Sequence, residues 1–261
     1  MRKAPPVVLS VAGSDPSGGA GIQADLKTFA ALEVFGAAAV TAITVQNTLG
    51  VTRVVPLDPA LVADQIDAVA TDLDVVALKI GMLANAGIVA AVADCIRRHR
   101  FGFVVADTLI RSSSGANLLD EDGVRIFRER ILPLATVITP NVTEAAELSG
   151  MDVRTIDDAR AAARRLVAIG AKAAIVTGGH LTGREAIDVL FDGRELVDVR
   201  AERIDSRHTH GTGCVFSSAL AARLALGDGL ATAARSAKAF VTRAITNAPG
   251  LGGGRGPLGI A

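Results

Sequence analysis

The chain has 261 residues, half of them hydrophobic, and its 27 basic and 27 acidic residues give a formal net charge of +0 at pH 7. This balance excludes the broad basic surface of a general nucleic-acid binder or of a protein held to anionic membranes. The only two cysteines, Cys95 and Cys214, cannot build a disulfide framework, so we expect a cytoplasmic protein.

The first apolar run, residues 7–13, follows two prolines and leads directly into a glycine-rich turn, which indicates a buried strand rather than a signal peptide. The longest nearly apolar run, residues 35–45, is about half the ~20 residues that a membrane-spanning helix requires. We therefore expect no membrane segment.

Apolar runs that predict buried strands alternate along the chain with runs that predict amphipathic helices. The strand runs are apolar throughout, which indicates strands covered on both faces, as in a parallel sheet flanked by helices. We therefore predict an α/β fold with a mostly parallel sheet. In chain order, strands are predicted at residues 7–13, 37–46, 75–81, 103–109, 136–140 and 173–179, and helices at 21–33, 60–72, 86–99, 121–132 and 159–170.

The pattern changes after residue 180. Residues 187–204 alternate between apolar and polar on both sides of Asp192-Gly193, which predicts an antiparallel hairpin at an edge of the sheet. Two long helices are predicted to follow, at 212–226 and 229–247. Because no linker, charge block or repeat divides the sequence, we predict one domain over residues 1–261.

In an open sheet of this kind, ligands bind outside the carboxyl ends of the strands. We therefore expect the binding site at this edge. The side chains that follow the predicted strands there are Ser14, Asp15, Gln46, Asn47, Met82, Asp107, Asn141 and Thr177.

The first glycine cluster contains the dinucleotide fingerprint G-x-G-x-x-A at Gly19, Gly21 and Ala24, so a Rossmann-type oxidoreductase is a rival hypothesis. Several residues separate Gly19 from the predicted strand, where the fingerprint requires a tight turn. The second strand also ends in Gln46 and Asn47 instead of an acidic residue that would bind a ribose. Both features count against this hypothesis.

Other motif-based classes are weaker. No G-K-[ST] sequence occurs, so a P-loop is absent. His208, His210 and Cys214 resemble part of a zinc site, but a fourth ligand and a paired C-x-x-C are missing.

The sequence HGTGC, residues 210–214, opens a predicted helix. The first N–H groups of a helix have no partner within the helix, and with the positive end of the helix dipole they form an anion site. Gly211 and Gly213 would allow a phosphate to approach the backbone closely. This position also predicts a lowered pKa for Cys214. A lone cysteine is more often a small buried hydrophobe, but the flanking glycines favour a functional position here.

Six motifs are spread over nearly the whole chain in the order AGSDPSGGAGIQADLKTF, TAITVQNTLGV, KIGML, TPNVTEAAEL, GGH and HTHGTGC. Together they resemble the hydroxymethylpyrimidine/phosphomethylpyrimidine kinases of the ribokinase-like superfamily. The resemblance implies a three-layer α/β/α fold and a homodimer. It also implies transfer of the γ-phosphate of ATP to 4-amino-5-hydroxymethyl-2-methylpyrimidine and then to its monophosphate, in thiamine biosynthesis. A pyridoxal kinase of the same superfamily and a catalytically silent binding homologue remain alternatives.

The resemblance also implies roles for single residues. An amide offers a donor beside an acceptor and a thioether packs well on a ring, which suits Gln46 and Met82 to an aminopyrimidine. The implied pyrimidine pocket consists of Gly13, Asp25, Gln46 and Met82. The implied anion hole consists of Gly211, Thr212, Gly213 and Cys214, with Cys214 at the position of a catalytic base.

The implied ATP and Mg²⁺ side contains two carboxylates, Asp107 and Glu144, as candidate metal-binding groups, an arrangement that Mg²⁺ favours. The remaining implied nucleotide-binding residues are Asn141, Thr177 and Lys238. Three places depart from the family pattern: Thr108-Leu109-Ile110 after Asp107, Thr177 in place of a common lysine, and Arg207-His208 in place of a Lys-Asn pair. The loop 111–119 is predicted to be a flap over the cleft.

Overall fold

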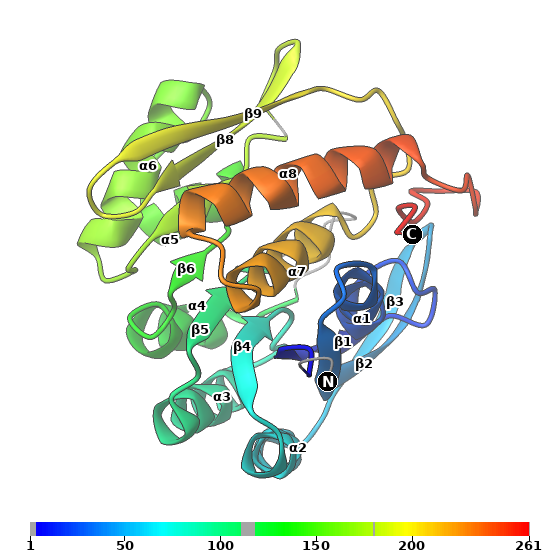
Figure 1. The fold of residues 1–261 in the computed structure, drawn as a ribbon, viewed down its shortest axis with the longest axis vertical. Coiled ribbons are helices and arrows are strands. Elements are labelled where there is room, and N and C mark those ends of the chain that lie inside the picture. The colour runs from blue at the N-terminus through cyan, green and yellow to red at the C-terminus, as the bar shows by residue number, and fades with distance from the viewer. Residues whose placement is uncertain (1–3, 111–117, 180, 261) are drawn as a thin grey trace.

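The structure is a computed structural model that describes residues 4–110, 118–179 and 181–260 (Figure 1). Most of the predicted flap, residues 111–117, lies outside the described residues. The described residues form one nine-stranded sheet in the order β3-β2-β1-β4-β5-β6-β7-β8-β9. The strands are β1 (Val7–Ser14), β2 (Phe35–Asn47), β3 (Gly50–Pro56), β4 (Val75–Ile80), β5 (Phe103–Ala106), β6 (Val137–Ile138), β7 (Ala174–Val176), β8 (Glu185–Phe191) and β9 (Leu196–Glu202).

The six strands from β2 to β7 in this order are parallel, whereas β3 and the β8–β9 hairpin are antiparallel additions at the two edges. Six consecutive residues of β1 are buried, because helices cover both faces of the central strands. The predicted α/β class and the edge hairpin are therefore confirmed.

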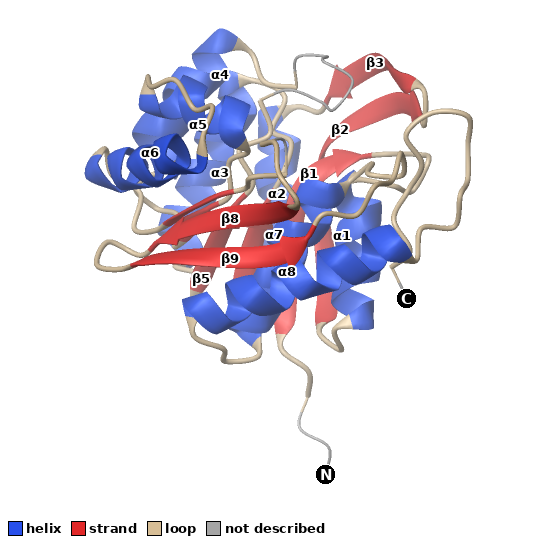
Figure 2. Cartoon of the chain, turned by 90° about the horizontal axis from the view of Figure 1, so that it is seen from above, coloured by secondary structure: helices blue, strands red, loops and turns tan. Residues whose placement is uncertain are grey.

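Helices form one layer on each side of the sheet, as Figures 1 and 2 show. One face is covered by α1, α7 and α8, which enclose one hydrophobic core, and the other by α2 to α6, which enclose a second. The helices are α1 (Gly21–Ala31), α2 (Pro59–Asp72), α3 (Ala86–His99), α4 (Glu121–Ile126) with a following π-helical turn (Phe127–Ile131), α5 (Val142–Ser149), α6 (Ile156–Ala168), α7 (Thr212–Ala225) and α8 (Leu230–Thr246).

Helix α7 is buried on nearly every side, from Cys214 to Ala222, because it lies between the sheet and the helices α1 and α8. A helix in this place is apolar all round and carries little amphipathic signal. Its start, Thr212, is fixed by the glycine turn that was predicted to open it.

Two elements were not predicted. β3 is an edge strand with exposed Thr52 and Arg53, so it lacks the continuous apolar run of a buried strand. α5 has eight residues, too few to show helical periodicity, but Asn141 and Glu144 form a capping box at its start.

No helix in the described part of the chain is both long and apolar enough to cross a membrane.

Candidate active site

Two glycine loops touch each other at the carboxyl edge of the sheet. One joins β1 to α1 and the other leads into α7. A Cβ atom at Gly211, where φ is 82°, would lie 1.9 Å from the carbonyl oxygen of Gly19. A Cβ atom at Gly21, where φ is 56°, would lie 2.2 Å from the carbonyl oxygen of Gly13. Both positions therefore require glycine, for space and for backbone conformation.

This contact brings the N-termini of α1 and α7 together. The first hydrogen bond of α7 runs from the Val215 N–H to the Gly211 carbonyl, 2.9 Å away. The N–H groups of Gly213 and Cys214 precede it and have no acceptor within the helix. They are suited to hold an anion, with the helix dipole behind them.

Cys214 lies at this helix start but its thiol is buried. Burial raises the pKa of Cys214 to about 12, and the carboxylates of Asp107 and Asp25 add to this effect. Lys79 and a hydrogen bond from the Gly21 N–H to the sulfur oppose it. The expectation that the helix start lowers the pKa of Cys214 is therefore wrong. Loss of hydration by the thiolate outweighs the helix start and the nearby lysine.

A buried ion pair lies beneath the two helix starts. The Nζ atom of Lys79 is 2.9 Å from both carboxylate oxygens of Asp25, and both side chains are fully buried. The hydroxyls of Ser10 and Ser218 donate to the two oxygens at 2.6 and 2.7 Å. Burial alone would lower the pKa of Lys79, but the Asp25 carboxylate holds it above the ordinary value.

The ion pair changes the interpretation of Asp25. We predicted that it lines a ligand pocket, and the structure shows that each of its two oxygens accepts from two protein donors. The predictions did not include Lys79. Its signal was a lysine inside the apolar run VVALKI, because a buried lysine is nearly always paired.

Asp107 and Glu144 are two further buried carboxyl groups in front of α7. Burial raises the pKa of Asp107 to about 6; Asp25 adds to this effect, while Lys79 and a bond from Ser217 oppose it. A Cβ atom at Gly213 would lie 3.6 Å from Asp107 Oδ2, so this carboxyl group is next to the predicted anion site.

Glu144 also carries a raised pKa, about 8, caused by burial and by the nearby charge of Asp107. Its Oε2 accepts from the Asn141 N–H at 3.0 Å and from the Thr108 hydroxyl at 3.1 Å. Its Oε1 is buried and has no hydrogen-bond partner among the described residues. Such an oxygen, close to a second carboxylate, fits Mg²⁺ or a water bound to Mg²⁺. Thr108, one of the departures from the family pattern, thus supports Glu144.

The predicted nucleotide residues Thr177 and Lys238 lie at the β6–β8 side. The Thr177 N–H donates to the Pro140 carbonyl at 2.8 Å, which joins the ends of β6 and β7. Lys238 is buried, and its Nζ donates to Asp188 Oδ1 at 2.8 Å. The same oxygen accepts from the Gly178 N–H at 3.0 Å. Lys238 is therefore tied to the loop after β7.

On the β2 side, Gly13 and Met82 are neighbours, since a Cβ atom at Gly13 would lie 3.1 Å from the Met82 sulfur. Gln46 is half-buried near the end of β2. Its Oε1 lies 3.2 Å from the hydroxyl of Thr44, which in turn donates to the Ser14 carbonyl at 2.9 Å. The structure thus brings three of the four predicted pocket residues to the end of β1 and β2.

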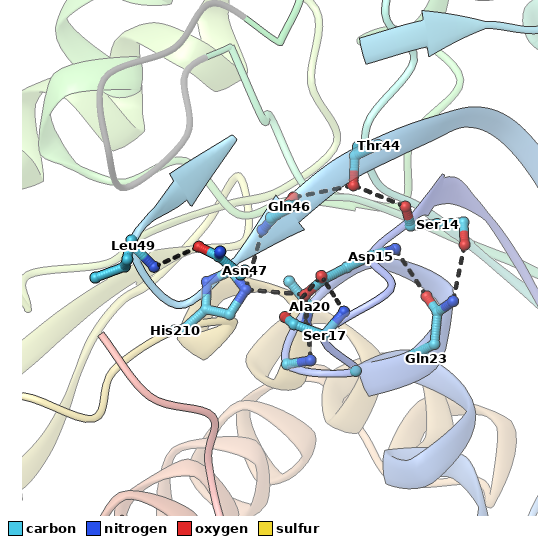
Figure 3. Close-up of polar contacts among 12 residues, drawn as sticks. Ser14, Asp15, Ser17, Ala20, Gln23, Thr44, Gln46, Asn47, Leu49 and His210 are labelled. Carbon is cyan, nitrogen blue, oxygen red and sulfur yellow. Dashed lines mark hydrogen bonds and ion pairs between the residues drawn. The ribbon is translucent and has the colours of Figure 1, made fainter. Parts of the chain in front are cut away.

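Asp15 organises the loop between β1 and α1, as Figure 3 shows. Its Oδ1 accepts from the N–H and hydroxyl of Ser17, at 2.9 and 2.7 Å. Its Oδ2 accepts from the N–H groups of Gly19 and Ala20 and from His210 Nε2, at 3.2, 2.9 and 2.9 Å. Burial opposes the charge, but the bonds from His210 and Ser17 lower the pKa of Asp15 to about 2. Asp15 was predicted only as a residue at a strand end.

This geometry supports neither a dinucleotide-binding fingerprint at Gly19 nor a zinc site formed by His208, His210 and Cys214. Gly19 belongs to the turn around Asp15 and packs against His210 instead of following the strand tightly. His210 faces Asp15, whereas His208 Nε2 accepts from Arg207 Nε at 3.3 Å, so the two histidines do not converge with Cys214.

The chain is similar to several known proteins. A family model described as phosphomethylpyrimidine kinase matches residues 15–259. The hydroxymethylpyrimidine/phosphomethylpyrimidine kinase of Rhizobium meliloti is 50% identical over 257 residues, covering 97% of this chain and 96% of that protein. The thiamine biosynthesis bifunctional protein ThiED of Geobacter sulfurreducens is 46% identical over 251 residues, which are 96% of this chain but 51% of ThiED. The chain therefore spans about half the length of this bifunctional relative.

A solved structure shares the fold. The ADP complex of Bacillus subtilis pyridoxal kinase matches with a TM-score of 0.90 and 39% sequence identity, covering 98% of this chain and 97% of that one.

The buried ion pair gives a first prediction. We expect Lys79→Met to reduce the free energy of unfolding by about 3 kcal/mol or more, because it leaves Asp25 buried without its counter-charge. The double variant Asp25→Asn with Lys79→Met should recover a large part of this loss. Urea unfolding measures both. Arg98→Met, which removes the exposed partner of Asp67, is the control and should cost less than about 1 kcal/mol. A Lys79→Met protein as stable as this control would contradict the prediction.

The raised pKa of Glu144 gives a second prediction. The unfolded chain loses this proton near pH 4.5 and the folded protein near pH 8, so folding becomes less favourable as the pH rises between these values. Without added nucleotide or Mg²⁺, we expect Glu144→Gln to increase the free energy of unfolding at pH 8.5 by on the order of 3 kcal/mol, with little effect at pH 4.5. Urea unfolding at both pH values tests this. Glu147→Gln, on the exposed face of α5, is the control; an equal effect of both substitutions would refute the assignment.

Proposed function

Because the chain belongs to the phosphomethylpyrimidine kinase family, we propose that it transfers the γ-phosphate of ATP to the hydroxymethyl group of 4-amino-5-hydroxymethyl-2-methylpyrimidine, then phosphorylates the monophosphate to the diphosphate, in thiamine biosynthesis. The observation that carries this proposal is the meeting of two helix N-termini at the Gly19–Gly211 contact, in front of the paired carboxyl groups of Asp107 and Glu144. Donors for phosphate oxygens and oxygen ligands for a cation lie on neighbouring elements there. We also propose that residues 1–261 form one kinase domain.

The pyrimidine pocket is proposed to lie at the ends of β1, β2 and β4. Gly13 leaves room beside the Met82 sulfur, which is suited to pack against an aromatic ring. Gln46 offers a donor and an acceptor side by side, as does the edge of an aminopyrimidine. Asp25 contributes from below, by pairing with Lys79 under α1 and α7.

The transferring phosphoryl group is proposed to lie against the residues from Gly211 to Cys214. The free N–H groups of Gly213 and Cys214 point their partial positive charge at the site where negative charge develops, and electrostatic stabilisation of this kind is the main source of rate in phosphoryl transfer. A substitution of Gly211 by alanine or a larger residue would push the two loops apart.

The resident cation is proposed to be Mg²⁺, held near Asp107 and Glu144 with Asn141 keeping Glu144 in place through the capping box. When bound, Mg²⁺ neutralises charge on the phosphates of ATP. Thr177 and Lys238 are proposed to face the nucleotide side of the cleft, at the end of β7 and on α8.

Cys214 is proposed to position the substrate hydroxyl rather than to remove its proton before transfer. With a pKa of about 12, the thiol of Cys214 is neutral at physiological pH. A dissociative transition state needs little help from a base, because the hydroxyl proton becomes acidic only late in the reaction. The N–H of Gly21 holds the sulfur toward the meeting point of α1 and α7.

We also propose a cytoplasmic homodimer. Exposed apolar side chains gather on the β2–β3 hairpin: Ile43, Val45, Leu49 and Val55 are 46%, 52%, 74% and 41% exposed. A cluster of this kind at a sheet edge is suited to pair with a second copy. Both cysteines are free, as expected in a reducing compartment.

A steady-state assay with Mg²⁺ and ATP tests the function. We expect turnover of both the pyrimidine alcohol and its monophosphate, and a kcat/KM for pyridoxal at least about tenfold lower. Turnover of pyridoxal alone would make the protein a pyridoxal kinase. Binding of the pyrimidine without transfer would make it a silent homologue.

The role of Cys214 is tested in the same assay. Cys214→Ala should lower kcat by on the order of 10- to 100-fold, with KM for the pyrimidine changed less than about threefold, because the thiol acts on the reacting oxygen. Cys95→Ala removes a buried thiol from α3, on the opposite face of the sheet, and should leave both constants near the wild-type values. Wild-type turnover by Cys214→Ala would show that the backbone of the turn suffices.

The homodimer is tested by analytical ultracentrifugation. We expect the wild type to sediment as a dimer at micromolar concentration, and Val45→Asp with Leu49→Asp to sediment as a monomer, since charges on a buried apolar interface are costly. Leu226→Asp, at an exposed leucine at the far end of α7, is the matched control and should stay dimeric. A monomeric wild type would refute the dimer.

A further inference from the structure

The hydrogen bonds around Gln46 point to a function for two residues outside the proposed pocket. We propose that Asp15 and His210 are positioning residues that hold the Gln46 amide in one orientation and so select an aminopyrimidine alcohol over a pyridine alcohol that carries a carbonyl group (Figure 3). The inference rests on the proposed function and concerns how the same pocket chooses its substrate.

Asp15 is the fixed point of this network. Its two oxygens accept five hydrogen bonds, and its pKa of about 2 keeps it ionised, so it can only accept. His210 Nε2 lies 2.9 Å from Asp15 Oδ2 and must therefore carry a proton and donate it. The histidine is 9% exposed, and its backbone N–H donates to the Gly256 carbonyl at 3.1 Å, so the surrounding protein holds both its side chain and its main chain.

The protonated Nε2 decides which end of the Gln46 amide can face it. Gln46 Nε2 stands 3.1 Å from His210 Nε2, and two donors at this distance repel each other. Exchange of the amide oxygen and nitrogen keeps the same distances, removes this repulsion and lets the amide oxygen share the single Nε2 proton with Asp15. We therefore assign Gln46 Oε1 to the side of His210.

The other end of the amide leads to the same orientation. The Thr44 hydroxyl has one proton, which it donates to the Ser14 carbonyl at 2.9 Å. It can then only accept from Gln46, 3.2 Å away, and this requires the amide nitrogen on that side. An ionised carboxylate at one end and a backbone carbonyl at the other thus favour the same orientation of the amide.

A fixed amide discriminates between two kinds of ring. In the aminopyrimidine the substituent beside the hydroxymethyl group is an amine, which donates. In pyridoxal it is a carbonyl, which accepts. The oxygen of the Gln46 amide has two lone pairs, so it can accept from His210 and also face the ring. With the hydroxymethyl group held at the start of α7, this oxygen would accept from the amine of the first ring and repel the carbonyl oxygen of the second. A wrong pairing leaves a buried group without its bond, which costs about 1–3 kcal/mol.

The test exploits the shapes of the two amide side chains. Glutamine at position 210 places a donor where His Nε2 lies, whereas asparagine is too short to do so. We would measure Kd by calorimetry for the aminopyrimidine alcohol and for pyridoxal. His210→Gln should keep the wild-type ratio of the two constants within about threefold, and His210→Asn should reduce it about tenfold or more, since a loose amide can turn to suit either ring.

Thr44→Val removes the acceptor at the other end with little change of shape, and it should reduce the ratio in the same way. His208→Asn, at a histidine that faces Arg207, and Thr52→Val, on the exposed edge strand β3, are matched controls and should keep the ratio. Thermal unfolding of each variant confirms that it is folded.

The inference is overturned if His210→Asn and Thr44→Val keep the wild-type ratio, or if His210→Gln loses it as fully as His210→Asn. These outcomes leave the proposed function intact when the wild type phosphorylates the pyrimidine and Gln46→Ala weakens its binding. A wild type that fails to phosphorylate the pyrimidine overturns the proposed function, and this inference with it.

Discussion

The close contact of two backbone loops governs the proposed site. With no Cβ atom at position 211, the start of α7 can rest on the Gly19 carbonyl, and the N-termini of α1 and α7 then face a common point. Each helix brings N–H groups that have no acceptor within the helix and the positive end of its dipole. The contact therefore concentrates positive potential above the buried ion pair of Lys79 and Asp25.

Buried ionisable groups surround this point, and they are arranged at the expense of stability. Asp107 and Glu144 have pKa values of about 6 and about 8 because little water reaches them, which makes their ionised forms unfavourable. Lys79 supplies one positive charge beneath them and pairs with Asp25. A bound cation would favour ionisation of the two carboxyl groups, which is consistent with the proposed Mg²⁺ site.

Much of the fold could be predicted from the sequence because buried parallel strands, such as the run at β1, are apolar on both faces and the hairpin turn at Asp192-Gly193 has a local signal. The start of α7 could also be predicted, since the glycines of HGTGC stand directly before a long apolar run. Burial and partner choice could not be predicted. They depend on tertiary contacts, which raise the pKa of Cys214 instead of lowering it and pair Asp25 with Lys79.

The C-terminal segment, residues 254–256, contacts two loops beside the proposed pocket, although nothing in its composition predicted this. The Arg255 N–H donates to the Thr48 carbonyl at 2.9 Å, at the turn between β2 and β3, and the Gly256 carbonyl accepts from the His210 N–H. A Cβ atom at Gly254 would lie 2.1 Å from the same Thr48 carbonyl, so the segment is pressed onto this turn. Figure 1 shows the C-terminus beside β2 and β3. The last residues of the chain thus hold together the strand that carries Gln46 and the loop that carries His210. The proposed choice of substrate at Gln46 therefore depends on tertiary contacts between the first, second and last parts of the sequence, which no single motif contains.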